Sequence, residues 1–352
     1  MSELKGGKMK KKHLYQLDII RAVCAVFVVC YHFSCACEIF EVQGYYNILY
    51  RFANGTWGEM AVSVFFMLSG AAMIYNYEGI ELKLPNFYKK RWLTLFPMFY
   101  VMWILMYVIK ASVNNNWFWG GEPKLMLLSL FGIDGYFYYR HPNYHSIGEW
   151  FLGAIIFLYM LFPILKKLFE RFRWPATIML TAAWGLIFFV DFFQVSTFHN
   201  LITCVWSFWI GMLLIEYRDY WKRLWPCFAA CWIALTLWKL PVNDTVGMNL
   251  TAVAAFGTLF SVGDCLMKSD IIRRIVLSLS KNSYGIFLTH HVIIDSWVKG
   301  KSGIRIGLLQ NVLWLLAVLG VSYISAEFLC KAVEVVRNGI EKIVKKRGRC
   351  TS

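Results

Sequence analysis

The stretch LDIIRAVCAVFVVCYHF, residues 17–33, decides the fold of this chain. The stretch is mostly apolar and contains three strongly polar side chains, those of Asp18, Arg21 and His32. About 20 apolar residues in a helix cross the hydrocarbon core of a bilayer. The strands of a membrane β-barrel instead alternate apolar and polar residues over about ten positions. The stretch therefore predicts a membrane-spanning helix.

Apolar runs of similar length recur along the chain between short charged clusters. Of the 352 residues, 59% are hydrophobic and 16% are charged, whereas soluble domains are nearer half apolar and a quarter charged. We therefore predict an all-α fold, a polytopic membrane helical bundle of about ten transmembrane helices. The predicted spans are residues 16–37, 58–76, 92–110, 149–165, 176–193, 198–217, 226–240, 248–266, 283–299 and 306–330.

Lys and Arg collect on alternate connections between these spans, and this predicts the orientation. Cytoplasmic connections carry the excess of basic residues in membrane proteins, so both termini are predicted to be cytoplasmic. One predicted outer connection departs from the rule, because it holds Lys299, Lys301 and Arg305. The predicted organisation is a basic N-terminus over residues 1–13, a membrane domain over 14–330 and a basic tail over 331–352.

The formal net charge is +15, which on its own would suit a nucleic-acid partner. The positive charges lie beside predicted spans, and no soluble domain gathers them into a groove. Membrane lipids are therefore expected partners and nucleic acid is not. We expect a multi-pass protein of the cell membrane, that is, the plasma or inner membrane.

Ionisable groups inside a span are costly and mark candidate functional residues. Arg21 and His32 are eleven residues apart, so a turn of about 100° per residue brings them within roughly 20° on one helical face. Asp18 lies one turn from Arg21 and can pair with it. An aligned cation and imidazole suit an enzyme that anchors an anionic ligand and takes a proton from a nucleophile. They equally suit a proton-coupled transporter, or contacts with headgroups and a neighbouring helix.

The longest predicted outer connection, residues 111–148, is rich in aromatic side chains. Such rings stack on sugars, but anchoring at the membrane interface gives the same composition. His141 and His145 are four residues apart, with Pro142 between them and no accompanying carboxylate motif. No metal site is predicted there.

Five segments along the chain carry a further pattern. The first is Arg21 followed, after ten residues, by His32. The others are SVFFMLSGAAMIY at 63–75, FYKKRWLTLFPMFY at 87–100, EWFLGAIIFLYMLFP at 149–163 and SLSKNSYGIFLTHH at 278–291. In this order the segments resemble the acyltransferase-3 family of membrane enzymes, over about residues 14–330.

The resemblance implies transfer of an acyl group, usually acetyl from acetyl-CoA, across the membrane to a hydroxyl of a surface polysaccharide or its lipid-linked precursor. It implies that His32 and Arg21 are catalytic, with His32 acting as a general base or forming an acyl intermediate. Arg21 would also bind the donor phosphates, together with Arg91, Lys89 and Lys90. No metal is implied.

Further residues are expected to support this site. Asp18 would orient Arg21, because a carboxylate inside a basic mouth would otherwise repel the donor. The small pair Ser69 and Gly70 suits either a substrate contact or close helix packing. The supporting and substrate-contacting candidates are Asp18, Ser69, Trp150, Tyr284 and His290, with His290 favoured over the adjacent His291.

The chain departs from the family pattern in two segments. Many members have two arginines three residues apart in the third-helix segment, where this chain has Arg91 followed by Thr94. Many members also carry a Glu in the fourth-span segment, in the region of the apolar Ile155 and Ile156. Phosphate binding would therefore depend more on the lysines beside Arg91.

A transporter or exporter of a polysaccharide or acylated product is the alternative from another class. Such proteins often show internal repeats with broken helices at matching positions. The sequence shows no such repeat, and its clear intramembrane charges concentrate in the first span. This concentration favours the donor site of an enzyme.

Overall fold

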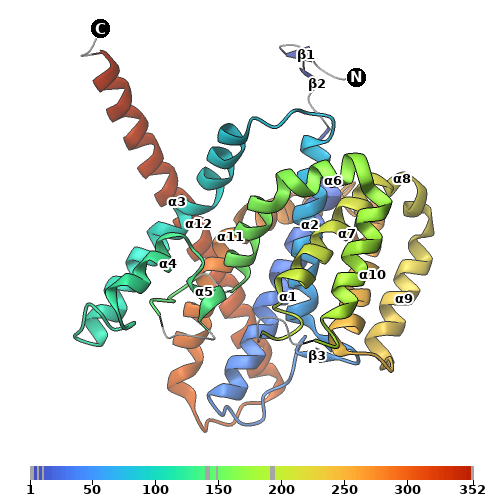
Figure 1. Ribbon diagram of the computed structural model, residues 1–352. Coiled ribbons are helices and arrows are strands. Elements are labelled where there is room, and N and C mark those ends of the chain that lie inside the picture. Colours follow the sequence, from blue (N-terminus) through green and yellow to red (C-terminus); the bar gives the residue numbers. More distant parts are fainter. Residues whose placement is uncertain are drawn as a thin grey trace. The chain divides into compact units, whose positions relative to one another are not determined.

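The computed structural model describes residues 4–5, 8–9, 12–138, 143–147, 150–190 and 195–349 (Figure 1). Most of these residues are α-helical. The strands named among them are two residues long and form two antiparallel pairs. β1 (Leu4–Lys5) pairs with β2 (Lys8–Met9), and β3 (Arg51–Phe52) pairs with β4 (Gly55–Thr56). The predicted all-α class is confirmed.

Long helices cover each of the predicted spans at least in part (Figure 1). They are α1 (Tyr15–Ile39), α2 (Trp57–Tyr77), α3 (Leu84–Val113), α6 (Trp150–Leu186), α7 (Leu201–Glu216), α9 (Trp225–Leu237), α10 (Asp244–Leu266), α11 (Asp270–Val298) and α12 (Leu308–Arg349). Shorter pieces connect them, namely η1 (Pro123–Leu125), α4 (Met126–Leu130), α5 (Asp134–Phe137), α8 (Arg218–Trp221), η2 (Lys222–Leu224) and η3 (Lys299–Lys301).

Side chains that cap the helix starts fix several boundaries. The Oγ1 of Thr56 accepts a hydrogen bond from the backbone N–H of Glu59, and its hydroxyl donates to the Glu59 carboxylate at 3.0 Å. Asn200 and Asn243 cap α7 and α10 in a related way, because each side-chain oxygen accepts from a backbone N–H two residues on. These bonds satisfy backbone donors that have no partner inside the helix.

Six described helices are long and apolar enough to cross a membrane: α1, α2, α3, α6, α10 and α12 as far as residue 338. The count is seven if α7 and the segment Arg218–Leu237, bent by 70°, form one broken span. The chain is therefore a multi-pass helical membrane protein. The number ten and the cytoplasmic location of the termini remain predictions, and so do the domain boundaries.

Helix α6 contains two of the predicted spans, separated by a kink. Its 37 residues would measure about 56 Å if straight, nearly twice the hydrocarbon thickness. The backbone leaves helical geometry at Phe172, with φ −134° and ψ 38°. The kink lies in the basic stretch 166–173 that separates the predicted spans 149–165 and 176–193. A helix of this length can therefore be two membrane segments joined at Phe172.

The chain divides into two compact units. The first unit comprises residues 1–31, 47–82 and 161–280, and the second comprises residues 32–46, 83–160 and 281–352. In the first unit, α2 packs very closely against α7. A Cβ atom at Gly70 would lie 1.9 Å from the carbonyl oxygen of Phe208, and one at Gly211 would lie 1.9 Å from that of Met67. Glycine is required at both positions because the two backbones approach there.

In the second unit, α11 lies against α12 through small residues. A Cβ at Gly285 would lie 2.8 Å from the Cβ of Ala326. Two backbone hydrogen bonds join the connection after α1 to the connection before α12. The N–H of Gln43 donates to the Ile304 carbonyl, and the Gln43 carbonyl accepts from the N–H of Ile306, each at 2.9 Å. These contacts hold the end of α1 in the same unit as α11.

Candidate functional site

Three histidines meet in the second unit, and two of them are predicted site residues. His32 lies on α1, and His290 and His291 lie on α11. The Nδ1 of His32 is 3.2 Å from the Nε2 of His290. The ring of His291 has its centroid 4.1 Å from that of His32 and 4.3 Å from that of His290. His290 is fully buried, whereas His32 and His291 are half-buried.

The backbone of α11 indicates which ring nitrogen of His290 carries the proton when that ring is neutral. The Nδ1 of His290 is 3.0 Å from the Ile286 carbonyl oxygen and 2.8 Å from that of Phe287. A carbonyl oxygen only accepts, so we assign the proton of neutral His290 to Nδ1. Its Nε2 then accepts the N–H of His32 Nδ1. The remaining lone pair of His32 is consequently on its Nε2.

In this tautomer the Nε2 of neutral His32 can accept a proton or attack an electrophilic carbon, and the role of His32 as base or nucleophile remains a prediction. A proton or an acyl carbon added at Nε2 would leave the ring positively charged. The Nδ1–H of the charged ring would still donate to His290, and such charge-assisted hydrogen bonds are stronger than neutral ones. The contact would therefore stabilise the product of either predicted reaction, and it does not discriminate between the two.

A second cluster surrounds Asp18 in the first unit. The Nη1 of Arg21 donates to the Oδ1 of Asp18 at 3.2 Å and to the hydroxyl oxygen of Ser280 at 3.0 Å. The hydroxyl of Ser280 donates to the same carboxylate oxygen at 2.6 Å. The Nε2 of His13 lies 2.5 Å from the other oxygen. Asp18 is 6% exposed, so its buried charge is compensated by these neighbours.

Arg21 is held in place and remains accessible. One third of its side chain, 33%, is exposed. The pairing with Asp18 follows from the one-turn spacing in the sequence. Ser280 was not predicted. Its only sequence signal is its position within the segment 278–291, ten residues before His290.

The predicted phosphate-binding cations of α3 belong to the second unit. The guanidinium of Arg91 lies over the rings of Phe87 and Tyr159, at 5.9 and 5.6 Å. Lys89 and Lys90 are exposed. The hydroxyl of Thr94 donates back to the Lys90 carbonyl at 2.8 Å. Arg21 is in the first unit, so a joint phosphate site remains a prediction.

The supporting candidates lie in different surroundings. The hydroxyl of Tyr284 donates to the Leu95 carbonyl of α3 at 3.1 Å. Trp150 is half-buried at the first turn of α6. Ser69 is half-buried on α2, and the close approach at the adjacent Gly70 is what the helix-packing interpretation expects. The catalytic and binding roles of all three remain predictions.

The predicted outer connection contains a buried carboxyl group that was not predicted. Asp134 is fully buried. Its carboxylate accepts the hydroxyl of Ser129 at 2.8 Å and the N–H of Gly135 at 3.0 Å. Burial raises the pKa of Asp134, and the nearby His145 opposes this rise. Tyr139 and His141, which belong to the same connection, lie outside the described residues.

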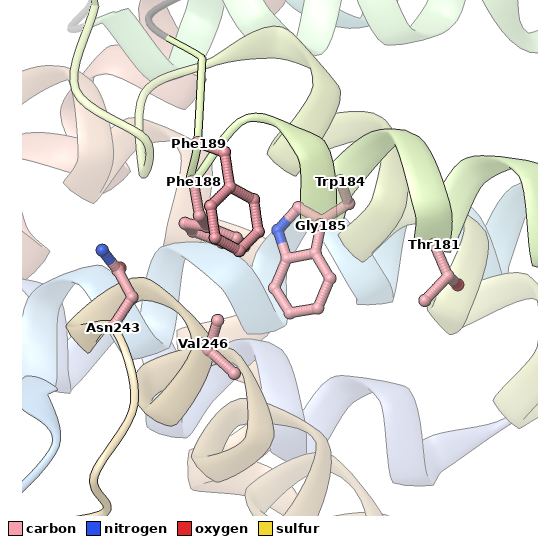
Figure 2. Close-up of a pocket in the computed structure, with 7 residues that line it drawn as sticks. All are labelled: Thr181, Trp184, Gly185, Phe188, Phe189, Asn243 and Val246. Carbon is pink, nitrogen blue, oxygen red and sulfur yellow. The ribbon is translucent and has the colours of Figure 1, made fainter.

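A pocket of about 470 Å³ lies in the first unit beside the end of α6. Figure 2 shows the aromatic side chains of Trp184, Phe188 and Phe189 near Asn243 and Val246. Trp184 also stacks on Trp206, with ring centroids 4.0 Å apart. None of the predicted site residues lines this pocket.

Comparisons with known proteins add one match. A family model described as an acyltransferase domain matches residues 14–327, which is nearly the whole chain. The search of curated proteins found no match, and the search of solved structures found none.

Proposed function

The chain belongs to the acyltransferase-3 family, and from this premise we propose that it transfers an acetyl group from acetyl-CoA to a hydroxyl of a surface polysaccharide or its lipid-linked precursor. Family membership supports acyl transfer in general and does not favour the transporter alternative. The observation that carries the proposal is the 3.2 Å contact between the Nδ1 of His32 and the Nε2 of His290, because it supports a defined tautomer for a neutral His32.

In the direct reaction, the acceptor hydroxyl gives its proton to the Nε2 of His32 as its oxygen attacks the thioester carbonyl. The new C–O bond forms the ester, and the C–S bond breaks. The thiolate of coenzyme A then takes the proton back from His32. The base is regenerated, and the products are the ester and the free thiol.

In the two-step reaction, the Nε2 of His32 attacks the thioester first and displaces the thiolate. The acceptor oxygen then bonds to the carbonyl carbon as the bond from that carbon to Nε2 breaks, and the hydroxyl proton neutralises the thiolate. His32 is released as the neutral imidazole. Both routes use the lone pair on Nε2, so both need the proton of neutral His32 to be on Nδ1. This shared requirement makes His32 the residue to test first.

We propose that the donor phosphates bind to cations. Arg21 is the strongest candidate because its side chain is one third exposed while its guanidinium is held by Asp18 and Ser280. A guanidinium presents several N–H donors in a planar fork that suits phosphate oxygens. Arg91 and the exposed Lys89 and Lys90 are the further candidates. The plasma or inner membrane is the proposed location, since it gives access to cytosolic acetyl-CoA and to an outer glycan.

The test compares the surface glycans of a deletion strain that carries either the wild type, His32→Ala or the control His199→Ala. His199 bonds to Ser196 in the first unit and is not part of the histidine cluster. We expect ester signals in NMR spectra from wild-type and His199→Ala cells and none from His32→Ala cells, with equal membrane levels of the three proteins. Full ester content with His32→Ala would rule out the catalytic role of His32.

A further inference from the structure

We propose that His32, His290 and His291 form a Zn²⁺-binding site and that Zn²⁺ bound there inhibits acyl transfer. The binding site is inferred from geometry alone, whereas the inhibition rests on the proposed function of His32. Each of the three residues offers one ring nitrogen, and these nitrogens all lie within 4.8 Å of one another. Three histidines with a fourth position open are an established Zn²⁺ donor set in proteins.

The separation of two of the nitrogens fits a shared cation. Zn²⁺ binds imidazole nitrogens at about 2.0–2.1 Å in tetrahedral geometry, which places two ligand nitrogens about 3.3–3.4 Å apart. The Nδ1 of His32 and the Nε2 of His290 are 3.2 Å apart. Zn²⁺ can therefore replace the hydrogen bond between these rings with little movement of either side chain.

The ring of His291 also lies close to the other two rings, although its position on the helix alone would not predict this. Adjacent residues on a helix project about 100° apart, yet the rings of His290 and His291 are 4.3 Å apart and both lie close to His32. Their side chains thus converge on α1. The sequence could not predict this convergence, and it favoured His290 alone.

His290 also has the hydrogen bond that metal-binding histidines usually make. Such a histidine normally donates its second ring N–H to a carboxylate, a backbone carbonyl or water, and this bond fixes the tautomer that leaves a lone pair for the metal. The Nδ1 of His290 contacts the Ile286 and Phe287 carbonyls, so its Nε2 carries the lone pair.

Zn²⁺ and the acceptor hydroxyl would compete for His32. A neutral imidazole has one basic nitrogen, so a ring whose lone pair binds a metal cannot accept a proton or attack a thioester. For Nδ1 of His32 to bind Zn²⁺, its proton must move to Nε2. No proton is released and no electron is transferred in this change. With Zn²⁺ on Nδ1 and the proton on Nε2, neither nitrogen of His32 would have a lone pair left to accept a proton.

The binding test uses the full-length protein in lipid nanodiscs after treatment with a chelator. Zn²⁺ is titrated by calorimetry, and Co²⁺ is titrated by its visible absorption, which reports coordination geometry. The variants are His291→Ala and His291→Phe, the second of which keeps an aromatic ring. His199→Ala is the matched control. We expect one Zn²⁺ per chain in the wild type and control, and an affinity at least about tenfold lower in both His291 variants.

Equal affinity in the wild type and both His291 variants would overturn the binding site, as would the lack of stoichiometric binding in the wild type. A second measurement follows acetyl-CoA turnover at increasing Zn²⁺. We expect inhibition of the wild type and at least about tenfold weaker inhibition of the His291 variants. A rise in acetyl-CoA turnover with Zn²⁺ would overturn the proposal that bound Zn²⁺ inhibits acyl transfer. If no chain turned over acetyl-CoA, the proposed function would fail while the binding result stood.

Discussion

The Nδ1 of His32 lies 3.2 Å from the Nε2 of His290, whose other nitrogen contacts two backbone carbonyls. We therefore propose that His290 is a positioning residue that sets the tautomer of His32. We predict that His290→Ala lowers kcat by about 10²-fold, within the range that general-base catalysis contributes, and leaves the KM for acetyl-CoA unchanged. His290→Gln should recover part of kcat, because its amide oxygen can accept the His32 N–H. Equal losses in both variants would argue against this role.

Ser280 should act on donor binding through Arg21. Ser280→Ala removes a hydrogen bond to the guanidinium and another to the Asp18 carboxylate. Hydrogen bonds to charged groups are worth about 1.5–3 kcal/mol, so we predict a KM for acetyl-CoA about tenfold higher or more, with kcat unchanged. Steady-state kinetics of purified protein measures both constants. A fall in kcat alone would show that Ser280 acts elsewhere.

The contact between α2 and α7 should not tolerate a methyl group. Gly70→Ala places a Cβ against the Phe208 carbonyl, and overpacking of this kind costs about 1–3 kcal/mol. We predict a lower unfolding temperature in detergent. Gly320→Ala is the matched control, because no atom lies within 4 Å of a Cβ at Gly320 on α12, and alanine there should stabilise the helix slightly. Equal unfolding temperatures for the two variants would contradict the close approach.

Asp134 should make stability depend on pH. Burial raises its pKa in the folded protein, so the folded state binds a proton more tightly than the unfolded state does. The unfolding free energy should therefore fall as pH rises from the ordinary carboxyl pKa, about 4, through the raised value. Asp134→Asn removes this titration. The unfolding temperature of the wild type minus that of Asp134→Asn should fall as pH rises over that range. A difference that does not change with pH would show that the pKa of Asp134 is not raised.

Helix periodicity explains which parts of the site could be predicted. Asp18 and Arg21 are one turn apart on a single helix, so their pairing follows from geometry that every α-helix shares. The kink in α6 coincides with a charged break between apolar runs. In both cases the deciding information is local in the sequence.

Contacts between distant segments explain what could not be predicted. Ser280 contacts Arg21 across 259 residues of sequence, and His290 contacts His32 across 258. No periodicity specifies that His291 also turns toward α1, because this depends on how α11 is rotated against its neighbour. Asp134 was missed for a related reason, since only the folded connection buries its carboxyl group.

The hydrogen bonds of His290 Nδ1 end on carbonyl oxygens of the main chain, and no side chain supplies them. The side chains at positions 286 and 287 can therefore be substituted without changing which nitrogen of His290 is protonated. A proline that distorts this turn of α11 would change it. The hydrogen bonds of His290 Nδ1 are thus insensitive to the identity of the side chains at these two positions, and they depend on the helical turn itself.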